Sequence, residues 1–172
     1  MGLFRKVAIA LVAAAAVVLV WRALLLAVAL FVLIVLAFIG WQRFAVWNAA
    51  QRFRREKRPL GKDLLLVYSN SPHWQSYVEA SWLPRWNARA VVLNWSERST
   101  WERNQPEVAL FHALADQREY NPLAIVVPEH SRPVVVRFWR AFRDHKHGKD
   151  QKLRQQEAEL ERLLALHPPP GA

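Results

Sequence analysis

The sequence predicts an N-terminal transmembrane α-helical hairpin, followed by a small α/β domain with a three-stranded, mostly parallel sheet. Two observations lead to this fold class. Residues 1–41 are almost continuously apolar. Beyond residue 61, short apolar runs alternate with segments of helical periodicity, which is typical of α/β domains. The domain is therefore expected to be a three-layer unit of the Rossmann-like or flavodoxin-like type, with flanking helices and a C-terminal amphipathic helix.

The apolar N-terminus consists of two runs, residues 7–20 and 23–39, separated by Trp21-Arg22. As one straight helix they would extend about 50 Å, whereas the hydrocarbon core of a bilayer is about 30 Å thick. A hairpin with spans at residues 3–20 and 23–41 removes this mismatch. The alternatives are a single span at 23–41, with the first run packed elsewhere, and a cleaved signal peptide.

The net charge of +10 is concentrated near the apolar runs. Residues 1–60 hold nine Lys or Arg and one acidic residue, a net of +8. Residues 61–172 hold fifteen and thirteen, a net of only +2. Because the cations cluster after the second run, the positive-inside bias places that side in the cytoplasm, at the plasma (inner) membrane.

The chain is expected to divide into a membrane anchor (1–42), a basic juxtamembrane segment (43–61), a cytoplasmic α/β domain (62–166) and a disordered tail (167–172). The residues expected at the membrane interface are Trp21, Trp41, Arg43, Trp47, Arg52, Arg54, Arg55, Lys57 and Arg58. Anionic lipid headgroups are the partner that this cluster predicts. Nucleic acid is a weaker interpretation, since the juxtamembrane position already explains the charge.

Three apolar runs, residues 63–69, 89–95 and 123–127, are predicted to be strands. Helices are predicted from Ser71-Pro72 to Leu83, from Pro106 to Arg118, from Pro133 to His147, and from Asp150 to Leu166. Serine, aspartate and proline favour helix starts, while Pro84 and Gly148 favour helix ends. The last helix carries a narrow stripe of leucines, which we expect to pack on the sheet; pairing with another helix is the alternative.

If the three strands run parallel, the loops that follow them meet at one edge of the sheet, where open α/β folds bind ligands. The candidate ligand-binding residues in these loops are Ser69, Asn70, Ser71, Ser96, Arg98, Glu129 and Arg132. The candidate acid-base residues are His73, His130 and Glu97. Arginines would hold a phosphate or carboxylate, and a histidine oriented by a carboxylate would transfer a proton. The other interpretation is that these loops are polar because they face water and cap helices.

Several functional classes are excluded or disfavoured by composition. The chain has no cysteine, so it has no disulfide, thiol nucleophile or thiolate-ligated metal. Its five glycines are too far apart for a dinucleotide fingerprint, a P-loop or a hydrolase elbow. His145 and His147 would point apart on a helix, so they do not predict a shared metal. We predict neither a cofactor nor a metal.

Two functional hypotheses follow. The first is a non-enzymatic interaction or accessory protein that acts at the cytoplasmic membrane face, with a membrane protein or a second copy as its partner. Loop tryptophans such as Trp86, Trp95 and Trp101 would mark a partner surface, unless they simply pack at the core edge. The alternative is an enzyme or ligand sensor that binds an anionic, phosphorylated or lipid-linked small molecule at the strand edge.

Overall fold

The computed structural model describes residues 2–115 and 121–168. The chain divides into two compact units, Met1–Arg43 and Phe44–Ala172, and each is described by itself. The second unit is called the domain below. Of the predicted tail, residues 169–172 lie outside the described residues, as do residues 116–118 of the second predicted helix.

The first unit consists of helix α1 (Gly2–Lys57), which also supplies the first residues of the domain. The predicted hairpin is not what the structure shows, because residues 20–23 are helical and α1 has no turn there. The physical reason is that Trp21-Arg22 lacks Gly, Pro or Asn, and both residues are compatible with a helix. Among the described residues, α1 is the one helix long and apolar enough to cross a membrane.

The sheet of the domain has four strands in the order β2-β1-β3-β4. They are β1 (Leu64–Tyr68), β2 (Ala90–Asn94), β3 (Leu123–Val126) and β4 (Val134–Arg137). Strands β1 and β2 are parallel, whereas β3 is antiparallel to both β1 and β4. The expected three-stranded, mostly parallel sheet is thus a four-stranded mixed sheet. The three predicted strands are confirmed in position, but the direction of β3 is not the one expected.

The additional strand β4 replaces the first part of a predicted helix. That prediction, a helix from Pro133, is wrong for residues 134–137. Three consecutive valines favour the extended conformation. Because β4 follows β3 after a short loop, the two strands form an antiparallel pair. The helix begins only at Trp139 (α5, Trp139–His145).

Helical segments cover both faces of the sheet. Between β1 and β2 the chain forms α2 (Gln75–Tyr77), the π-helical η2 (Val78–Trp82) and α3 (Leu83–Trp86). The other segments are η1 (Arg58–Leu60), η3 (Trp95–Thr100), α4 (Pro106–Leu114) and α6 (Gln151–Leu166). The predicted stop at Pro84 does not occur, because Pro84 lies in the first turn of α3, where its missing N–H is not needed.

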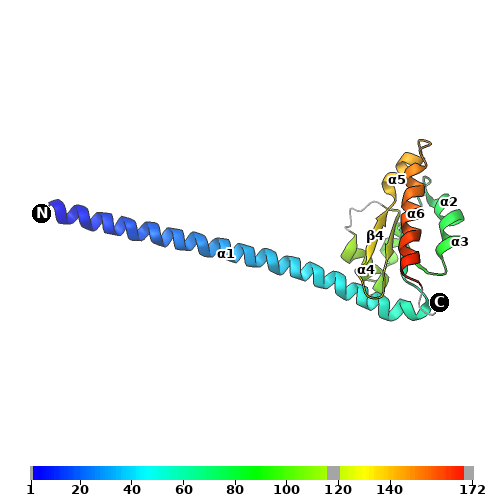
Figure 1. Cartoon of the computed structure of the whole chain (residues 1–172), viewed down its shortest axis with the longest axis horizontal. Helices are drawn as coiled ribbons and strands as arrows, with labels where there is room; N and C mark the ends of the chain where they lie inside the picture. Colours follow the sequence, from blue (N-terminus) through cyan, green and yellow to red (C-terminus); the bar gives the residue numbers. More distant parts are fainter. Residues whose placement is uncertain (1, 116–120, 169–172) are drawn as a thin grey trace. The chain divides into compact units, whose positions relative to one another are not determined.

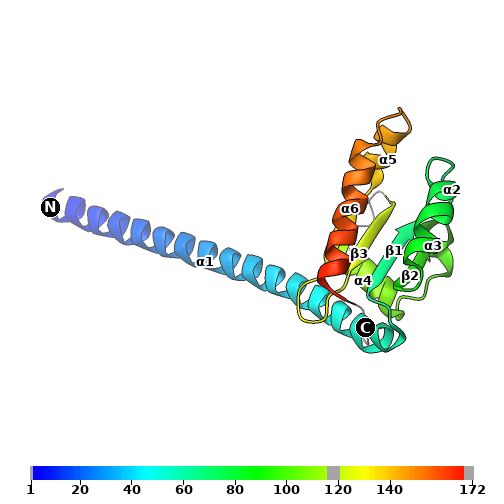
Figure 2. The same cartoon turned by 45° about the vertical axis from the view of Figure 1, so that its right-hand side comes forward.

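The core has two parts because strand side chains alternate between the faces of the sheet. On one face, Leu64 and Leu66 pack with side chains of α2, η2, α5 and α6. Figures 1 and 2 show α6 running beside the strands of the sheet. The leucine stripe of α6 lies here, as predicted: Leu153, Leu160, Leu163 and Leu164 are buried. On the other face, Leu65 and Val67 pack with α4 and with the last turns of α1.

Those last turns of α1 are the main departure from the expected domain boundary. Ala49, Ala50 and Phe53 are buried against the sheet, and Phe53 is 0% exposed. Residues 44–57, which the sequence suggested lie in a juxtamembrane segment, are therefore a structural helix of the domain.

Candidate functional site

The predicted ligand-binding edge is only partly assembled. Because β1 and β2 are parallel, the loops that follow them meet: the Asn70 amide donates to Ser96 Oγ (3.0 Å) and Asn94 Nδ2 donates to Asn70 Oδ1 (2.7 Å). The loop after β3 leaves the sheet at the opposite edge, since β3 is antiparallel to β1. His73 and His130 therefore follow strands that end at opposite edges, and the expected three-loop site does not form.

The polar side chains in the loops that follow β1 and β2 form hydrogen bonds with one another. Asn94 Oδ1 accepts the Ser96 amide (3.0 Å), which caps η3, and Asn94 Nδ2 also donates to Glu97 Oε1 (3.2 Å). Ser69 Oγ accepts the indole N–H of Trp74 (3.2 Å). These bonds hold the two loops together, so they account for the polar residues without a ligand.

Ser71, Arg98 and His73 have local partners as well. Ser71 Oγ accepts the His73 amide at 3.4 Å, and its carbonyl accepts the amides of Trp74 and Gln75. The Arg98 guanidinium stacks 5.2 Å from the centre of the Trp95 ring and donates to the Trp95 carbonyl (3.3 Å). His73 itself is exposed. Within the described residues, no charged side chain at this edge of the sheet is both buried and without a partner.

At the opposite edge, the loop after β3 binds the end of α1. Arg54 Nε donates to the Pro128 carbonyl (2.7 Å), and its Nη2 donates to the Ser131 carbonyl. Arg58 pairs with Glu129 at 2.9 Å. Burial, followed by the nearby charge of Arg58, lowers the pKa of Arg54. Glu129 thus has a structural partner, whereas His130 and Arg132 remain exposed.

Two more cations of the basic cluster fasten α1 to the residues at the start of α4. Arg52 Nη2 donates to the Asn104 carbonyl, and Lys57 pairs with Glu107 at 2.9 Å. Four of the six cations expected at the membrane interface after residue 41 therefore have partners within the domain. The signal that could have revealed this was the small apolar stripe of Ala49, Ala50 and Phe53, at helical spacing beside the arginines.

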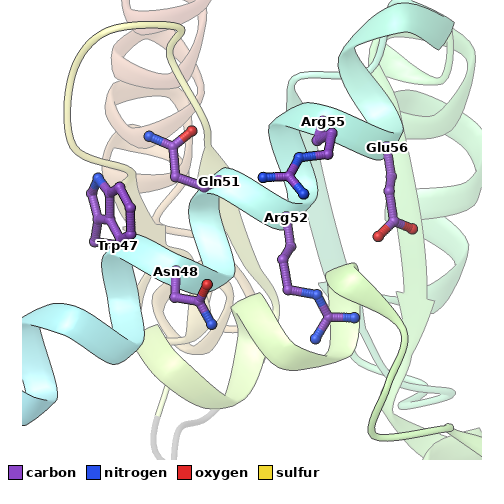
Figure 3. Close-up of a pocket in the computed structure, with 6 residues that line it drawn as sticks. All are labelled: Trp47, Asn48, Gln51, Arg52, Arg55 and Glu56. Carbon is purple, nitrogen blue, oxygen red and sulfur yellow. The ribbon is translucent and has the colours of Figure 1, made fainter.

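The outer face of the same helical turns carries a solvent-open hollow of about 510 Å³. It is lined by Trp47, Asn48, Gln51, Arg52, Arg55 and Glu56, which Figure 3 shows along successive turns of α1. Trp47 is 55% exposed, and its ring lies 5.9 Å from that of Phe44, which is also exposed. Arg55 is exposed and, within the described part of the chain, has no ion pair. This surface therefore combines an exposed aromatic ring with an uncommitted cation.

A third polar feature lies at the partly exposed edge of the core that α2, η2, α5 and α6 form. The Tyr77 hydroxyl and the Trp82 indole N–H both donate to Glu157 Oε1, at 2.8 and 2.7 Å. The Trp82 ring, 1% exposed, packs 4.4 Å from Phe138 and 5.4 Å from Phe142. Burial, then the hydrogen bond to Glu157 and its charge, raises the pKa of Tyr77 to about 12.

The raised pKa of Tyr77 predicts a loss of stability at high pH. In the unfolded chain a tyrosine ionises near pH 10. The folded domain keeps the proton on Tyr77 up to about pH 12, so this contribution is complete below pH 10 and is lost between pH 10 and 12. We expect Tyr77→Phe to flatten the pH dependence of the unfolding free energy in this window, measured by denaturant titration. Parallel pH profiles for the two proteins would contradict the assignment.

Among the described residues, no group of three His, Asp or Glu side chains could hold a metal ion. No known protein family matches this chain, and neither does a characterised protein or a solved structure.

Proposed function

We propose that this chain is a single-span membrane protein whose α/β domain acts at the cytoplasmic face as a non-enzymatic interaction or accessory protein. The observation that carries the proposal is that the domain begins where the apolar helix ends. Only Gln42 and Arg43 separate Trp41 from Phe44, the first residue of the domain. Two residues span at most about 7 Å, so the domain would be held at the membrane surface.

The orientation rests on the distribution of cations. Six Lys or Arg follow Trp41 within seventeen residues, against Arg5 and Lys6 before the apolar run. The positive-inside bias depends on the number of cations near the ends of a span, so it holds even for cations that later pair within the domain. It favours a cytoplasmic domain at the plasma (inner) membrane.

The outer face of α1 supports contact with anionic lipid. Trp47 follows Trp41 by six residues, so the Trp47 end of the hollow stays within about 20 Å of the end of the apolar run, whatever the arrangement of the two units. Exposed tryptophan is favoured at a bilayer interface, and each nearby cation contributes about 1 kcal/mol on an anionic surface. Trp47 and Arg55 are the residues we assign to this contact. Arg52, Arg54, Lys57 and Arg58 would serve mainly to dock the helix.

An interaction role is favoured over catalysis because the acid-base candidates are separated. His73 and Glu97 follow β1 and β2, whereas His130 and Glu129 follow β3 at the other edge. An enzyme or sensor for an anionic small molecule would have to use the β1–β2 edge alone. Most of the polar side chains there already bind one another.

A panel of single cysteines tests the topology, since the chain has none of its own. In intact cells, an impermeant maleimide should label Gly2→Cys, whereas Ser99→Cys in the exposed part of η3 should react only after permeabilisation. Labelling of Ser99→Cys from outside would overturn the proposed orientation. Protection at position 2 together with labelling at Trp21→Cys would instead establish the hairpin.

The same panel tests the lipid contact. In vesicles containing phosphatidylglycerol, a fluorophore on Gln51→Cys, in the hollow, should be quenched by lipids with a nitroxide headgroup. The same fluorophore on Ser99→Cys is the control and should be quenched less. Adding Arg55→Glu should reduce the quenching at position 51. Equal quenching at the two positions would remove the support for this surface.

A further inference from the structure

The first unit holds one charged residue within a long apolar helix. Between residues 7 and 39, Arg22 is the single charged side chain, and the whole stretch is helical. The described side chains of this stretch are exposed, including Val20 at 69% and Leu26 at 71%. Nothing in the described part of the chain covers residues 7–39 or pairs with Arg22.

A bilayer cannot cover this stretch by itself. Its 33 residues extend about 50 Å as a helix, and a tilt of 40° still leaves about 38 Å against a core of about 30 Å. If the bilayer covers residues 23–41, the fourteen apolar residues 7–20 remain outside without a polar face that could lie on the membrane. If the bilayer instead covers part of residues 7–20, Arg22 enters the hydrocarbon, at about 2.5–3.5 kcal/mol.

Both placements leave surface that calls for a partner, and in the second one, with Arg22 inside the membrane, Arg22 indicates the chemistry of that partner. A cation in an apolar environment is stabilised by a carboxylate at the same depth. Residues 1–55 contain no Asp or Glu, so the same stretch of a second copy cannot supply one. The small side chains of Ala14, Ala15 and Ala16 would allow another helix to approach closely.

We propose that the N-terminal half of α1 docks against a transmembrane helix of another membrane protein, and that an Asp or Glu of that helix pairs with Arg22. This inference rests on the proposed single span. It adds to the proposed interaction role the chemical nature of the partner, which is an apolar helix with one acidic residue.

The test uses the full chain in lipid vesicles together with synthetic polyleucine transmembrane peptides. One peptide carries a central Glu, and two matched peptides carry Gln or Leu at that position. Energy transfer is measured between a donor on Gly2→Cys and an acceptor on the peptide. We expect the Glu peptide to associate at least about threefold more tightly than the Gln and Leu peptides.

The variants make the result specific to the ion pair. Arg22→Leu should abolish the preference for the Glu peptide, and Arg22→Glu should transfer it to a peptide with a central Lys. Arg5→Leu, which removes a cation outside the apolar run, is the matched control and should keep the preference. Equal association of all three peptides would overturn the inference. The inference would also be overturned if the chain associated with itself and the Glu peptide did not reduce that self-association.

This experiment and the cysteine panel can fail separately. Peptide preference in vesicles does not depend on which side the domain faces, whereas the labelling of Ser99→Cys depends on nothing else. A cytoplasmic domain without peptide preference would leave the proposed function standing and remove the partner chemistry.

Discussion

Replacing Phe53 by alanine is expected to destabilise the domain by about 3–5 kcal/mol. Phe53 is 0% exposed and packs with Leu65, Val67 and Phe111 in the core beneath α4. Truncating a buried phenylalanine removes its transfer free energy and leaves a cavity. For a unit of this size, the loss should lower the melting temperature by about 10 °C or more. Near-UV circular dichroism of the full chain in detergent follows this transition without the backbone signal of the apolar helix.

The matched control is Arg55→Ala, on the exposed face of the same two turns. It should change the unfolding free energy by less than about 0.5 kcal/mol, as surface substitutions usually do. If Phe53→Ala were as mild as Arg55→Ala, residues 44–57 would not be part of the domain. The boundary suggested by the basic segment, at residue 62, would then stand.

Arg89→Met is expected to cost about 3–5 kcal/mol, because it leaves the Asp63 carboxylate buried without its cation. Asp63 is 1% exposed. Arg89 Nε donates to Asp63 Oδ1 (3.0 Å) and Nη2 to Oδ2, while Nη1 donates to the carbonyl of Leu164 near the end of α6 (2.9 Å). One side chain thus ties the start of β1 to the last helix. Thermal unfolding of the full chain measures the effect.

Two comparisons isolate the cause. The Arg85–Glu161 pair also joins this region to α6, but both side chains are about half exposed, so Arg85→Ala should cost no more than about 1 kcal/mol. The double variant Asp63→Leu/Arg89→Met should recover much of the stability, since it removes the buried charge as well as its partner. If the double variant were less stable than Arg89→Met, the burial of an unpaired carboxylate would not be the cause.

Local pattern was enough to locate most elements of the domain. The apolar runs at residues 64–68, 90–94 and 123–126 are strands because each combines β-favouring residues with flanking turn residues. The leucine stripe of α6 packs on the sheet, as its spacing predicts. At Val134–Arg137, the helical spacing of the later aromatic residues suggested a helix from Pro133, six residues before α5 begins at Trp139.

The candidate site was less predictable because it depended on strand direction. An apolar run gives the position of a buried strand, but it does not tell which way the chain passes through the sheet. The expected edge with three loops assumed that β3 runs parallel to β1, and the antiparallel pairing moves Glu129, His130 and Arg132 to the opposite edge. There Glu129 pairs with Arg58, a cation that the sequence had placed on lipid.

The sequence by itself determined the apolar N-terminal helix, the concentration of positive charge beside it, the absence of thiol chemistry and the positions of three strands. These follow from composition and from periodicities within a single segment. The tertiary structure decided which cations face the domain and which remain outside, how β3 and β4 are oriented, and which loops meet. Those outcomes depend on contacts between residues far apart in the chain, such as Arg54 with Ser131 and Arg89 with Leu164. The hydrophobic periodicity of a helix or strand shows which of its faces is buried, but it does not specify which other segment packs on that face.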